Sequence, residues 1–467
     1  MNVFDTIAAV STPRGKGGIA VIRISGADAI TVAEKVFLPK SKKPLSATEH
    51  AKTVYGDIRA KDTDGTVINI DDGMATCFYA PRSFTGENTV EISCHGGVLI
   101  TETVLEAVFA AGARPATAGE FTRRAFISGR MSLSQAQSLG ELLEARTQGQ
   151  LLLSRSGVRG VLSDKIEELY TKLGDVLSSI YAKIDFPDED LADMTREQML
   201  DAFTDVKHAV DKLASTYKTG HAVSEGIKTV ICGRTNAGKS SLYNRIVGRD
   251  AAIVTDIEGT TRDLLEETVA FGKVTLRLCD TAGLRETSDA VESIGVERAR
   301  RVMKDAELVL AVFDGSRDPD DEDKELLSEL KESAACVIPV LNKCDAWGEN
   351  SPMADAVKDA GFGNAVVISA ASGEGIDALS RMVDEKFTDG EIDLRYDAVV
   401  ADARQYAALL QASEALCGVI DEMQAGYELD VCCVDAEGAM NALGEINGHH
   451  VGEDIVSSIF HKFCVGK

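Results

Sequence analysis

The segment with the clearest chemistry is residues 233–240, which reads GRTNAGKS. It fits the pattern GxxxxGK[ST], in which glycines let backbone N–H groups wrap the phosphates of a nucleotide. The ammonium of Lys239 would reach the β- and γ-phosphates, and the hydroxyl of Ser240 would bind Mg²⁺. A chance glycine-rich turn is the alternative, so this segment alone indicates a nucleotide site without establishing one.

Three later segments argue against a chance turn. LCDTAG offers Asp280 for the Mg²⁺ shell and Gly283 for an N–H near the γ-phosphate. LNKCD offers Asp345, whose carboxylate can accept from guanine N1–H and N2–H₂ together, whereas adenine lacks these donors. ISAAS would form a backbone lid over guanine O6. We therefore predict a GTP site with these residues: Asn236, Ala237, Gly238, Lys239, Ser240, Ser241, Thr255, Asp256, Ile257, Thr260, Thr261, Asp280, Thr281, Ala282, Gly283, Asn342, Lys343, Asp345, Ser369, Ala370 and Ala371.

The motifs do not identify the residue that acts on the attacking water in GTP hydrolysis. IVTDIEGTTRD resembles a first switch segment, with Thr261 as a second Mg²⁺-binding hydroxyl, although a plain polar loop is the alternative. Leu284 follows DTAG where many small GTPases carry a water-orienting glutamine, and leucine cannot orient water. The acidic side chains of the next loop are the candidates, and the spacing does not decide among Glu286, Asp289 and Glu292.

Elements that could position these groups are visible as short runs rich in Val, Ile and Leu. IKTVICG, VTLRLCD, ELVLAVFDG, CVIPVLN and AVVISA alternate with helical stretches over residues 223–388. Such runs are typical of buried parallel strands in an α/β sheet. The motifs fall at the ends of these runs, where a nucleotide site needs them.

The segments before and after residues 223–388 have different sequence patterns. Residues 1–125 mix β-rich runs, such as GGIAVIRISG and NTVEISCHGG, with the helical run TETVLEAVFAAGA, which indicates an α+β domain. Residues 126–222 and 389–467 are helical. One predicted helical face steps by three or four residues and should end before Pro187; it comprises Ile166, Leu169, Leu173, Val176, Ile180 and Ile184. The fold class we predict is multidomain α/β, with a helical bundle interrupted by an inserted P-loop domain.

Composition limits the class of protein. The 467 residues suffice for about three domains. The formal net charge, 49 − 75 = −26, does not favour strong non-specific binding to nucleic acid. Ten cysteines without a CxxC pair suggest reduced thiols, and no apolar run approaches the roughly 20 residues of a membrane span. The start lacks the layout of a secretory signal, so we expect a cytoplasmic protein without membrane association.

Three segments together resemble the MnmE family of tRNA-modification GTPases, also called TrmE: GRTNAGKSSLYN, AAIVTDIEGTTRD and DTAGLRE, ahead of a terminal FCVGK. DTIAAVSTPRGKGGIAVIRISG, SFTGENTVEISCHGG and GEFTRRAF also follow the family pattern, so the resemblance covers essentially the whole chain. It implies modification of wobble uridine at C5 in certain tRNAs, GTP hydrolysis, and one-carbon transfer from a reduced folate such as 5-formyltetrahydrofolate. It also implies a homodimer and a flavoprotein partner, MnmG, with tRNA bound mainly through the complex.

The resemblance further implies roles for individual residues. The G domains of the family dimerise through a bound K⁺, whose ligands would be Asn236, Thr255, Ile257 and Thr260. The catalytic glutamate of the family aligns with Glu292. The N-terminal domain resembles folate-binding domains, and its folate contacts fall on Arg23, Glu91, Arg130 and Lys467. A carboxylate can pair with the pterin edge and cations suit the glutamyl tail, whereas surface ion pairs are the alternative.

Two further segments carry open alternatives. Cys464, in the terminal HKFCVGK, would be a reactive thiol near the modification site or simply a packed cysteine. The segment TRRAFISGR is a basic cluster on an acidic chain, expected to attract anions or to form a solvated helix end. We predict four domains: a folate-binding and dimerisation domain at 1–125, helical segments at 126–222 and 389–467, and a G domain at 223–388. A regulatory GTPase switch that binds a ribosome or a protein partner, without one-carbon chemistry, is the rival hypothesis.

Overall fold

The computed structural model describes residues 5–61, 64–186, 194–249, 267–279, 306–347, 351–363, 365–449, 451–461, 463, 465 and 466. The chain divides into two compact units. Unit 1 contains residues 1–140 and 444–467, and unit 2 contains residues 141–443. Among the described residues, no helix is both long and apolar enough to cross a membrane.

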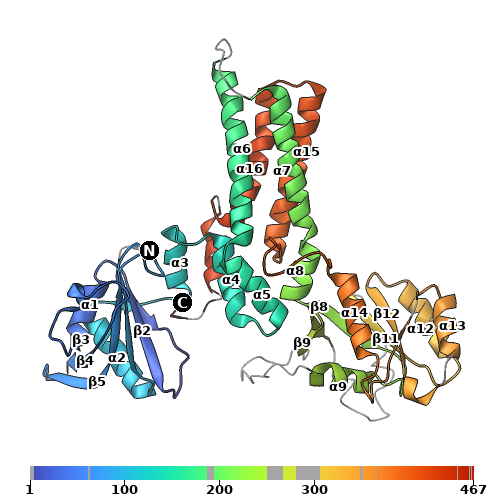
Figure 1. The fold of residues 1–467 in the computed structure, drawn as a ribbon, viewed down its shortest axis with the longest axis horizontal. Coiled ribbons are helices and arrows are strands. Elements are labelled where there is room, and N and C mark those ends of the chain that lie inside the picture. The colour runs from blue at the N-terminus through green and yellow to red at the C-terminus, as the bar shows by residue number, and fades with distance from the viewer. Residues whose placement is uncertain are drawn as a thin grey trace. The chain divides into compact units, whose positions relative to one another are not determined.

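Unit 1 is built on a seven-stranded sheet with the order β3-β4-β5-β6-β2-β1-β7. Neighbouring strands are antiparallel, except that β1 and β7 pair in parallel. The bounds of the strands are β1 Ile7–Val10, β2 Ile19–Ser25, β3 Phe37–Pro39, β4 Thr53–Lys61, β5 Val67–Phe78, β6 Thr89–His95 and β7 Arg114–Pro115. Helices α1 (Ala29–Val36) and α2 (Val98–Ala110) pack on one face of this sheet (Figure 1).

Alternation along β2 and β6 explains which face is covered. Ala20, Ile22 and Ile24 are buried in the core that contains α1 and α2. Since successive side chains of a strand point to opposite faces, the residues between them lie on the other face. Arg23 is one of these residues, and it lies directly opposite Glu91 of β6.

The rest of unit 1 joins distant parts of the sequence. A cluster of apolar side chains joins the start of α4 (Leu133–Glu144) to residues near the C-terminus: Leu133, Ala136, Val456, Phe460 and Phe463. Ser134 Oγ donates a hydrogen bond to Asn447 Oδ1 at 3.0 Å, across a separation of 313 residues. The remaining elements are the turn η1 (Leu45–Ala47) and helices α3 (Glu120–Ile127), α4 (Leu133–Glu144, which runs into unit 2) and α17 (Glu453–His461).

Unit 2 contains a six-stranded sheet with the order β13-β12-β11-β8-β10-β9. Its strands are parallel except for β9, which is antiparallel to β10. The strands are β8 Ile227–Cys232, β9 Glu267–Phe271, β10 Val274–Leu278, β11 Leu308–Asp314, β12 Cys336–Asn342 and β13 Val366–Val367. The associated helices are α9 Lys239–Arg249, α12 Asp321–Lys331, α13 Pro352–Asp359 and α14 Ile376–Phe387, with the turn η2 Cys344–Ala346. The five apolar runs predicted as strands therefore all form strands.

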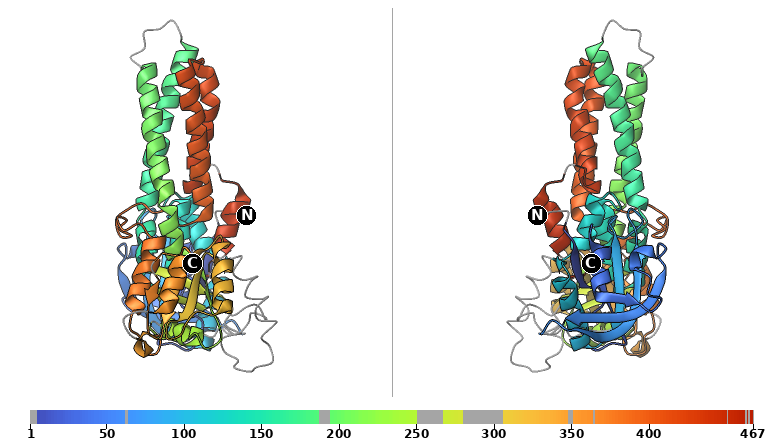
Figure 2. Two further views of the ribbon diagram at one scale, coloured as in Figure 1. Left: turned by 90° about the vertical axis from the view of Figure 1, so that its right-hand side faces the viewer. Right: turned by 90° about the vertical axis from the view of Figure 1, so that its left-hand side faces the viewer.

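The helical part of unit 2 comes from two separate stretches of sequence. Its long helices run side by side in the views of Figure 2. The helices are α5 Gln148–Val158, α6 Val161–Asp185, α7 Arg196–Ser215, α8 Tyr217–Ser224, α15 Ala403–Ala425 and α16 Leu429–Asn447, the last of which ends in unit 1. Of the six residues predicted to share one face of α6, the first five are buried, whereas Ile184 is 41% exposed. Helix α6 ends at Asp185, and Pro187 lies outside the described residues.

The predicted fold class, multidomain α/β with a parallel-sheet domain between two helical stretches, is confirmed. The boundaries of the four predicted domains remain predictions. The compact units divide the chain at other positions, because α4 and the residues after 443 pack with the N-terminal sheet domain.

Candidate functional site

The glycine-rich loop connects the end of β8 to the start of α9, and its glycines are required by their surroundings. Gly233 has φ +143°, and a Cβ there would lie 2.2 Å from the carbonyl oxygen of Val312. At Gly238, with φ +99°, a Cβ would lie 2.0 Å from Asn342 Nδ2. Asn236 also has a left-handed backbone, at φ +61°. Only residues without a side chain fit both glycine positions, so the loop can bring its amides close to a ligand.

Lys239 is the first residue of α9, and its side chain bends back over the loop. Its Nζ donates a hydrogen bond to the carbonyl oxygen of Arg234 at 2.6 Å. Burial lowers the pKa of Lys239, because the partly enclosed site disfavours its charged form. An anion at the N-terminus of α9 would favour the charged ammonium, so the arrangement suits a phosphate. Ala237 of the loop is buried, whereas Ser240 and Ser241 in the first turn of α9 are exposed.

Asn342, the last residue of β12, links two segments of the predicted site. Its Nδ2 donates to the carbonyl oxygen of Ala237 at 2.8 Å, and its Oδ1 accepts from the backbone N–H of Ala370 at 2.9 Å. The residue is 3% exposed. The nitrogen and the oxygen of one buried side-chain amide therefore hold the phosphate loop and residues 369–371 at a fixed separation.

Lys343 follows in a left-handed conformation, with φ +67°. Its Nζ donates to Asp314 Oδ2 at 2.6 Å. Burial raises the pKa of Asp314, but the hydrogen bonds from Lys343 and Ser316 outweigh this effect and lower it. The ion pair stabilises a backbone conformation that is costly for a lysine. Asp345, on the following turn η2, is exposed.

Residues 369–371 lie on a tight turn after β13. The N–H of Gly373 donates to Ser369 O at 2.8 Å, and the N–H of Ser369 donates to Glu374 O at 2.9 Å. Ser369 and Ala370 are buried, whereas Ala371 is exposed. The predicted residues of the phosphate loop, of β12 and of this turn are thus brought together at one edge of the sheet.

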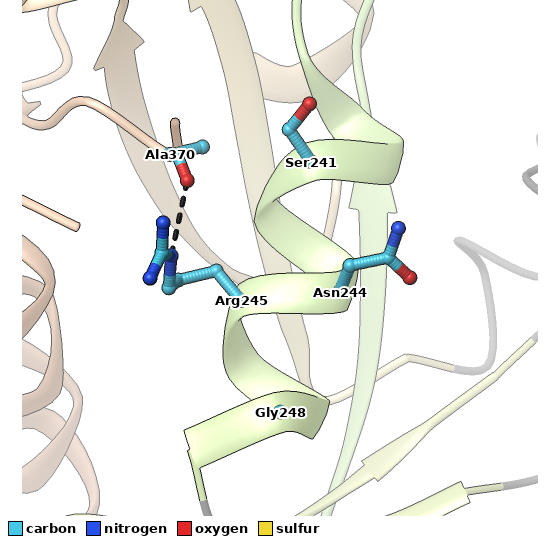
Figure 3. A pocket seen from close by; sticks show the side chains of 5 residues that line it. All are labelled: Ser241, Asn244, Arg245, Gly248 and Ala370. Carbon is cyan, nitrogen blue, oxygen red and sulfur yellow. Dashed lines mark hydrogen bonds between the residues drawn. The ribbon is translucent and has the colours of Figure 1, made fainter. Parts of the chain in front are cut away.

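A pocket of about 320 Å³ adjoins this edge (Figure 3). Its lining consists of Ser241, Asn244, Arg245, Gly248 and Ala370. Ser241 and Ala370 belong to the predicted site, whereas Arg245 is not among the predicted residues. The sequence does indicate this face of α9, because Asn244, Arg245 and Gly248 follow Ser241 at spacings of three, four and seven residues.

Several predicted residues lie outside the described residues and remain predictions. They are Thr255, Asp256, Ile257, Thr260, Thr261, Asp280, Thr281, Ala282, Gly283, Glu292, Cys464 and Lys467.

In unit 1, the structure brings Arg23 and Glu91 together across β2 and β6. Arg23 Nε donates to Glu91 Oε1 at 3.0 Å, and Nη2 lies 2.9 Å from the same oxygen. The guanidinium carbon also lies 5.1 Å from the ring centre of Phe84 and 5.7 Å from that of Phe121. An ion pair whose guanidinium lies near two aromatic rings forms a preorganised site with both a donor and an acceptor.

Arg130 is exposed and lies against the turn that contains Gly86. A Cβ on Gly86, which has φ +80°, would be 3.1 Å from Arg130 Cγ and 2.6 Å from Ser128 Oγ. Phe84, two residues before Gly86, contacts Arg23. One short loop therefore touches both predicted arginines.

The residues around Cys464 are attached to the N-terminal sheet domain. Val465 forms a β-bridge with Ala118, and Gly466 O accepts a hydrogen bond from Ser11 Oγ at 3.0 Å. A Cβ on Gly466 would lie 2.1 Å from Val10 O, so only glycine permits this approach.

The structure corrects the hypothesis for TRRAFISGR at Arg124. This residue is 4% exposed, and its guanidinium pairs with Asp5 at 2.8 Å, Glu87 at 3.1 Å and Glu120 at 3.1 Å. It is therefore neither a solvated helix end nor a free site for anions. Glu120 lies four residues earlier on the same helix, whereas Asp5 and Glu87 are distant in the sequence, so the local sequence gave no sign of these two partners.

The parallel sheet of unit 2, with a GxxxxGKS loop after β8 and an Asn-Lys-x-Asp segment at the end of β12, defines a P-loop GTPase. Two family models match the chain: the "MnmE helical domain" over residues 133–464 and the "GTP-binding protein TrmE N-terminus" over residues 6–130. The chain belongs to the MnmE family of tRNA modification GTPases, and this confirms the predicted family and enzyme class.

Similar proteins cover the whole chain. The tRNA modification GTPase MnmE of Thermoanaerobacter sp. (strain X514) is 36% identical over 467 residues, 100% of each chain. The protein of the same name from Moorella thermoacetica is 40% identical over 466 residues, 99% of each chain. A solved structure of Era in complex with MgGDPNP and ribosomal RNA is 25% identical, covers 40% of this chain and 66% of its own, and has a TM-score of 0.28.

Proposed function

We propose that this chain is the GTP-hydrolysing subunit of a cytoplasmic complex that modifies C5 of the wobble uridine in tRNA. The observation that carries the GTP site is the double hydrogen bond of Asn342 to Ala237 and Ala370. It joins the glycine-rich loop to the turn at residues 369–371, to which we assign contacts with the phosphates and with the base respectively. GTP and GDP are the ligands we assign to this site.

The chain's residues fit the charge of a magnesium nucleotide. The Lys239 ammonium lies half-buried at the N-terminus of α9, where phosphate oxygens would replace the Arg234 carbonyl as its partners. Ser240 and Thr261 would hold Mg²⁺, which neutralises charge on the phosphates. Asp345 would select guanine, and Glu292 would act on the attacking water. Asn236, Thr255, Ile257 and Thr260 would hold K⁺ on dimerisation of the G domains.

For the one-carbon chemistry, we assign a reduced folate to unit 1. The pair of Arg23 and Glu91, with two aromatic rings near the guanidinium, supplies a donor and an acceptor for a planar heterocycle. Arg130 and Lys467 would bind the carboxylates of a glutamyl tail. The attachment of Val465 and Gly466 to Ala118 and Ser11 supports a role for Cys464 beside this site.

The assembly we propose is a homodimer that works with an MnmG-like flavoprotein and binds tRNA mainly through that complex. A net charge of −26 supports indirect binding of tRNA, since an acidic surface repels a polyanion. Within each chain, residues 1–125 would bind folate and dimerise, residues 223–388 would hydrolyse GTP, and the segments 126–222 and 389–467 would connect them.

Two titrations of the purified chain test the proposal. A fluorescent GDP analogue should bind the wild type and lose at least tenfold in affinity with Lys239→Ala, whereas 5-formyltetrahydrofolate binding should be unchanged in that variant. Conversely, Arg23→Ala and Glu91→Ala should lose folate binding and keep the affinity for GDP. If the wild type binds GDP but no reduced folate, the one-carbon role is wrong and the chain is a regulatory GTPase.

A further inference from the structure

We propose that Arg245 is a positioning residue for guanine recognition, which holds the backbone at residues 370 and 371 so that the N–H of Ala371 faces guanine O6. The inference deepens the proposed GTP site and rests on it. It concerns a residue outside the sequence motifs, on the face of α9 that lines the adjoining pocket.

The contact consists of two hydrogen bonds from one guanidinium. Arg245 Nε donates to the carbonyl oxygen of Ala370 at 3.1 Å, and Nη2 donates to that of Ala371. Figure 3 shows the side chain extending from α9 to the backbone of Ala370. An ideal Cβ on Gly373 would lie 3.5 Å from Arg245 Cζ, so the guanidinium also lies against the turn that follows. Hydrogen bonds from a charged donor are stronger than neutral ones, and two of them fix an orientation.

Because the peptide group is planar, the hydrogen bond from Arg245 to the carbonyl of Ala370 also fixes the direction of the Ala371 N–H. In a trans peptide, the C=O of one residue and the N–H of the next point in opposite directions. Because the carbonyl of Ala370 faces Arg245, the N–H of Ala371 points away from it. The N–H of Ala370 is already bound to Asn342 Oδ1 at 2.9 Å. Asn342 and Arg245 thus fix consecutive peptide groups, and the N–H of Ala371 becomes the donor for the base.

The arrangement also links the two ends of a bound nucleotide. Helix α9 begins at Lys239, beside the phosphates, and carries Arg245 to the base-contacting turn. The carbonyls that Arg245 holds belong to residues 125 and 126 positions later in the chain. A shift of α9 on phosphate binding would therefore change the position of the Ala371 amide.

The test compares GDP with 6-thio-GDP, in which sulfur replaces O6 as a weaker acceptor. We expect Arg245→Ala to bind GDP about tenfold more weakly than the wild type, which corresponds to about 1.4 kcal/mol. Its preference for GDP over 6-thio-GDP should shrink towards unity. The KM for GTP should rise with kcat nearly unchanged. Arg245→Lys, which can reach one carbonyl, should give intermediate values.

Arg381→Ala is the matched control, because Arg381 donates to a carbonyl within its own helix, Asp377 O at 3.3 Å. It should leave both affinities at wild-type values. Equal losses for GDP and 6-thio-GDP in Arg245→Ala, or no loss for either, would overturn the role of Arg245. If the wild type itself binds neither nucleotide, the proposed GTP site fails, and this outcome is distinct from a failure of the Arg245 variants.

Discussion

Asn342 donates from Nδ2 to the carbonyl oxygen of Ala237 at 2.8 Å, and this hydrogen bond is buried. A Cβ on Gly238 would lie only 2.0 Å from the same Nδ2. The phosphate loop and the end of β12 therefore fit together only with glycine on one side and a short amide on the other.

Replacing Asn342 by Ala should weaken GDP binding by roughly 100-fold. The variant leaves a buried carbonyl at Ala237 and a buried N–H at Ala370 without their partner, at about 1–3 kcal/mol for each group. Titration with a fluorescent GDP analogue measures the loss. Gln411→Ala, on the exposed side of α15, is the control and should bind as the wild type does. Wild-type affinity in Asn342→Ala would contradict the bridging role.

Asp345→Asn should change the preferred base. The carboxylate accepts from two donors of guanine, whereas an amide can donate to the 2-oxo group of xanthine. We expect GTP turnover to fall at least tenfold and XTP turnover to rise above that of the wild type. Steady-state hydrolysis of both nucleotides decides this. A parallel fall for GTP and XTP would mean that Asp345 supports the fold instead of reading the base.

GTP turnover should depend on the monovalent cation. If K⁺ supplies positive charge at the phosphates, replacing K⁺ by Na⁺ at constant ionic strength should lower kcat roughly tenfold or more. Phosphate release in the two salts measures the effect. Asn236→Ala should remove the difference between the salts while retaining nucleotide binding. Equal rates for the wild type in K⁺ and Na⁺ would eliminate the K⁺ assignment.

Because of Glu120, we expect the free energy of unfolding of unit 1 to depend on pH. Burial raises the pKa of Glu120, but hydrogen bonds from Arg114, Thr117 and Arg124 outweigh it and lower the pKa from 4.5 to about 2. A lowered pKa adds stability that is fully present above pH 4.5 and is lost as the pH falls through about 2.

We therefore expect Glu120→Gln to reduce the free energy of unfolding by about 3 kcal/mol at pH 7 and by much less near pH 2. Urea denaturation across this range gives the difference. Glu102→Gln, on the exposed side of α2, should show little loss at any pH. A loss for Glu120→Gln that stays constant from pH 7 to pH 2 would refute the assignment.

Cys464→Ser should separate the two activities of the chain. GTP turnover should stay within twofold of the wild type, while modification of tRNA in the reconstituted complex should be abolished, since a hydroxyl is a far poorer nucleophile than a thiolate. Mass analysis of tRNA nucleosides reports the modification. Cys417→Ser, at an exposed cysteine of α15, is the matched control. Normal modification in Cys464→Ser would assign this cysteine to packing.

The sequence predicts the strands of unit 2 well, because buried parallel strands are continuous apolar runs with polar motifs at their ends. It does not reveal β9, whose residues ETVAF form a short antiparallel edge strand. Periodicity also groups Ile184 with the buried face of α6, but the helix ends one residue later and this side chain is exposed.

The candidate site likewise contains residues that the sequence predicts and residues that it does not. Lys239 and Asn342 belong to motifs whose spacing is local, so the sequence identifies them. Arg245 donates to carbonyls more than a hundred residues away, and two of the three carboxylates that pair with Arg124, those of Asp5 and Glu87, come from distant segments. Only the folded chain brings such partners together.

The hydrogen bond between Ser134 and Asn447 has a consequence for synthesis on the ribosome. The N-terminal segment of unit 1 emerges first, yet residues 444–466, which complete its apolar cluster, emerge only after all of unit 2. During that interval Leu133 and Ala136 lack the side chains that bury them in the finished protein, and exposed apolar surface favours aggregation and chaperone binding. Premature termination shortly before residue 444 would therefore leave a folded GTPase unit attached to an incomplete N-terminal one.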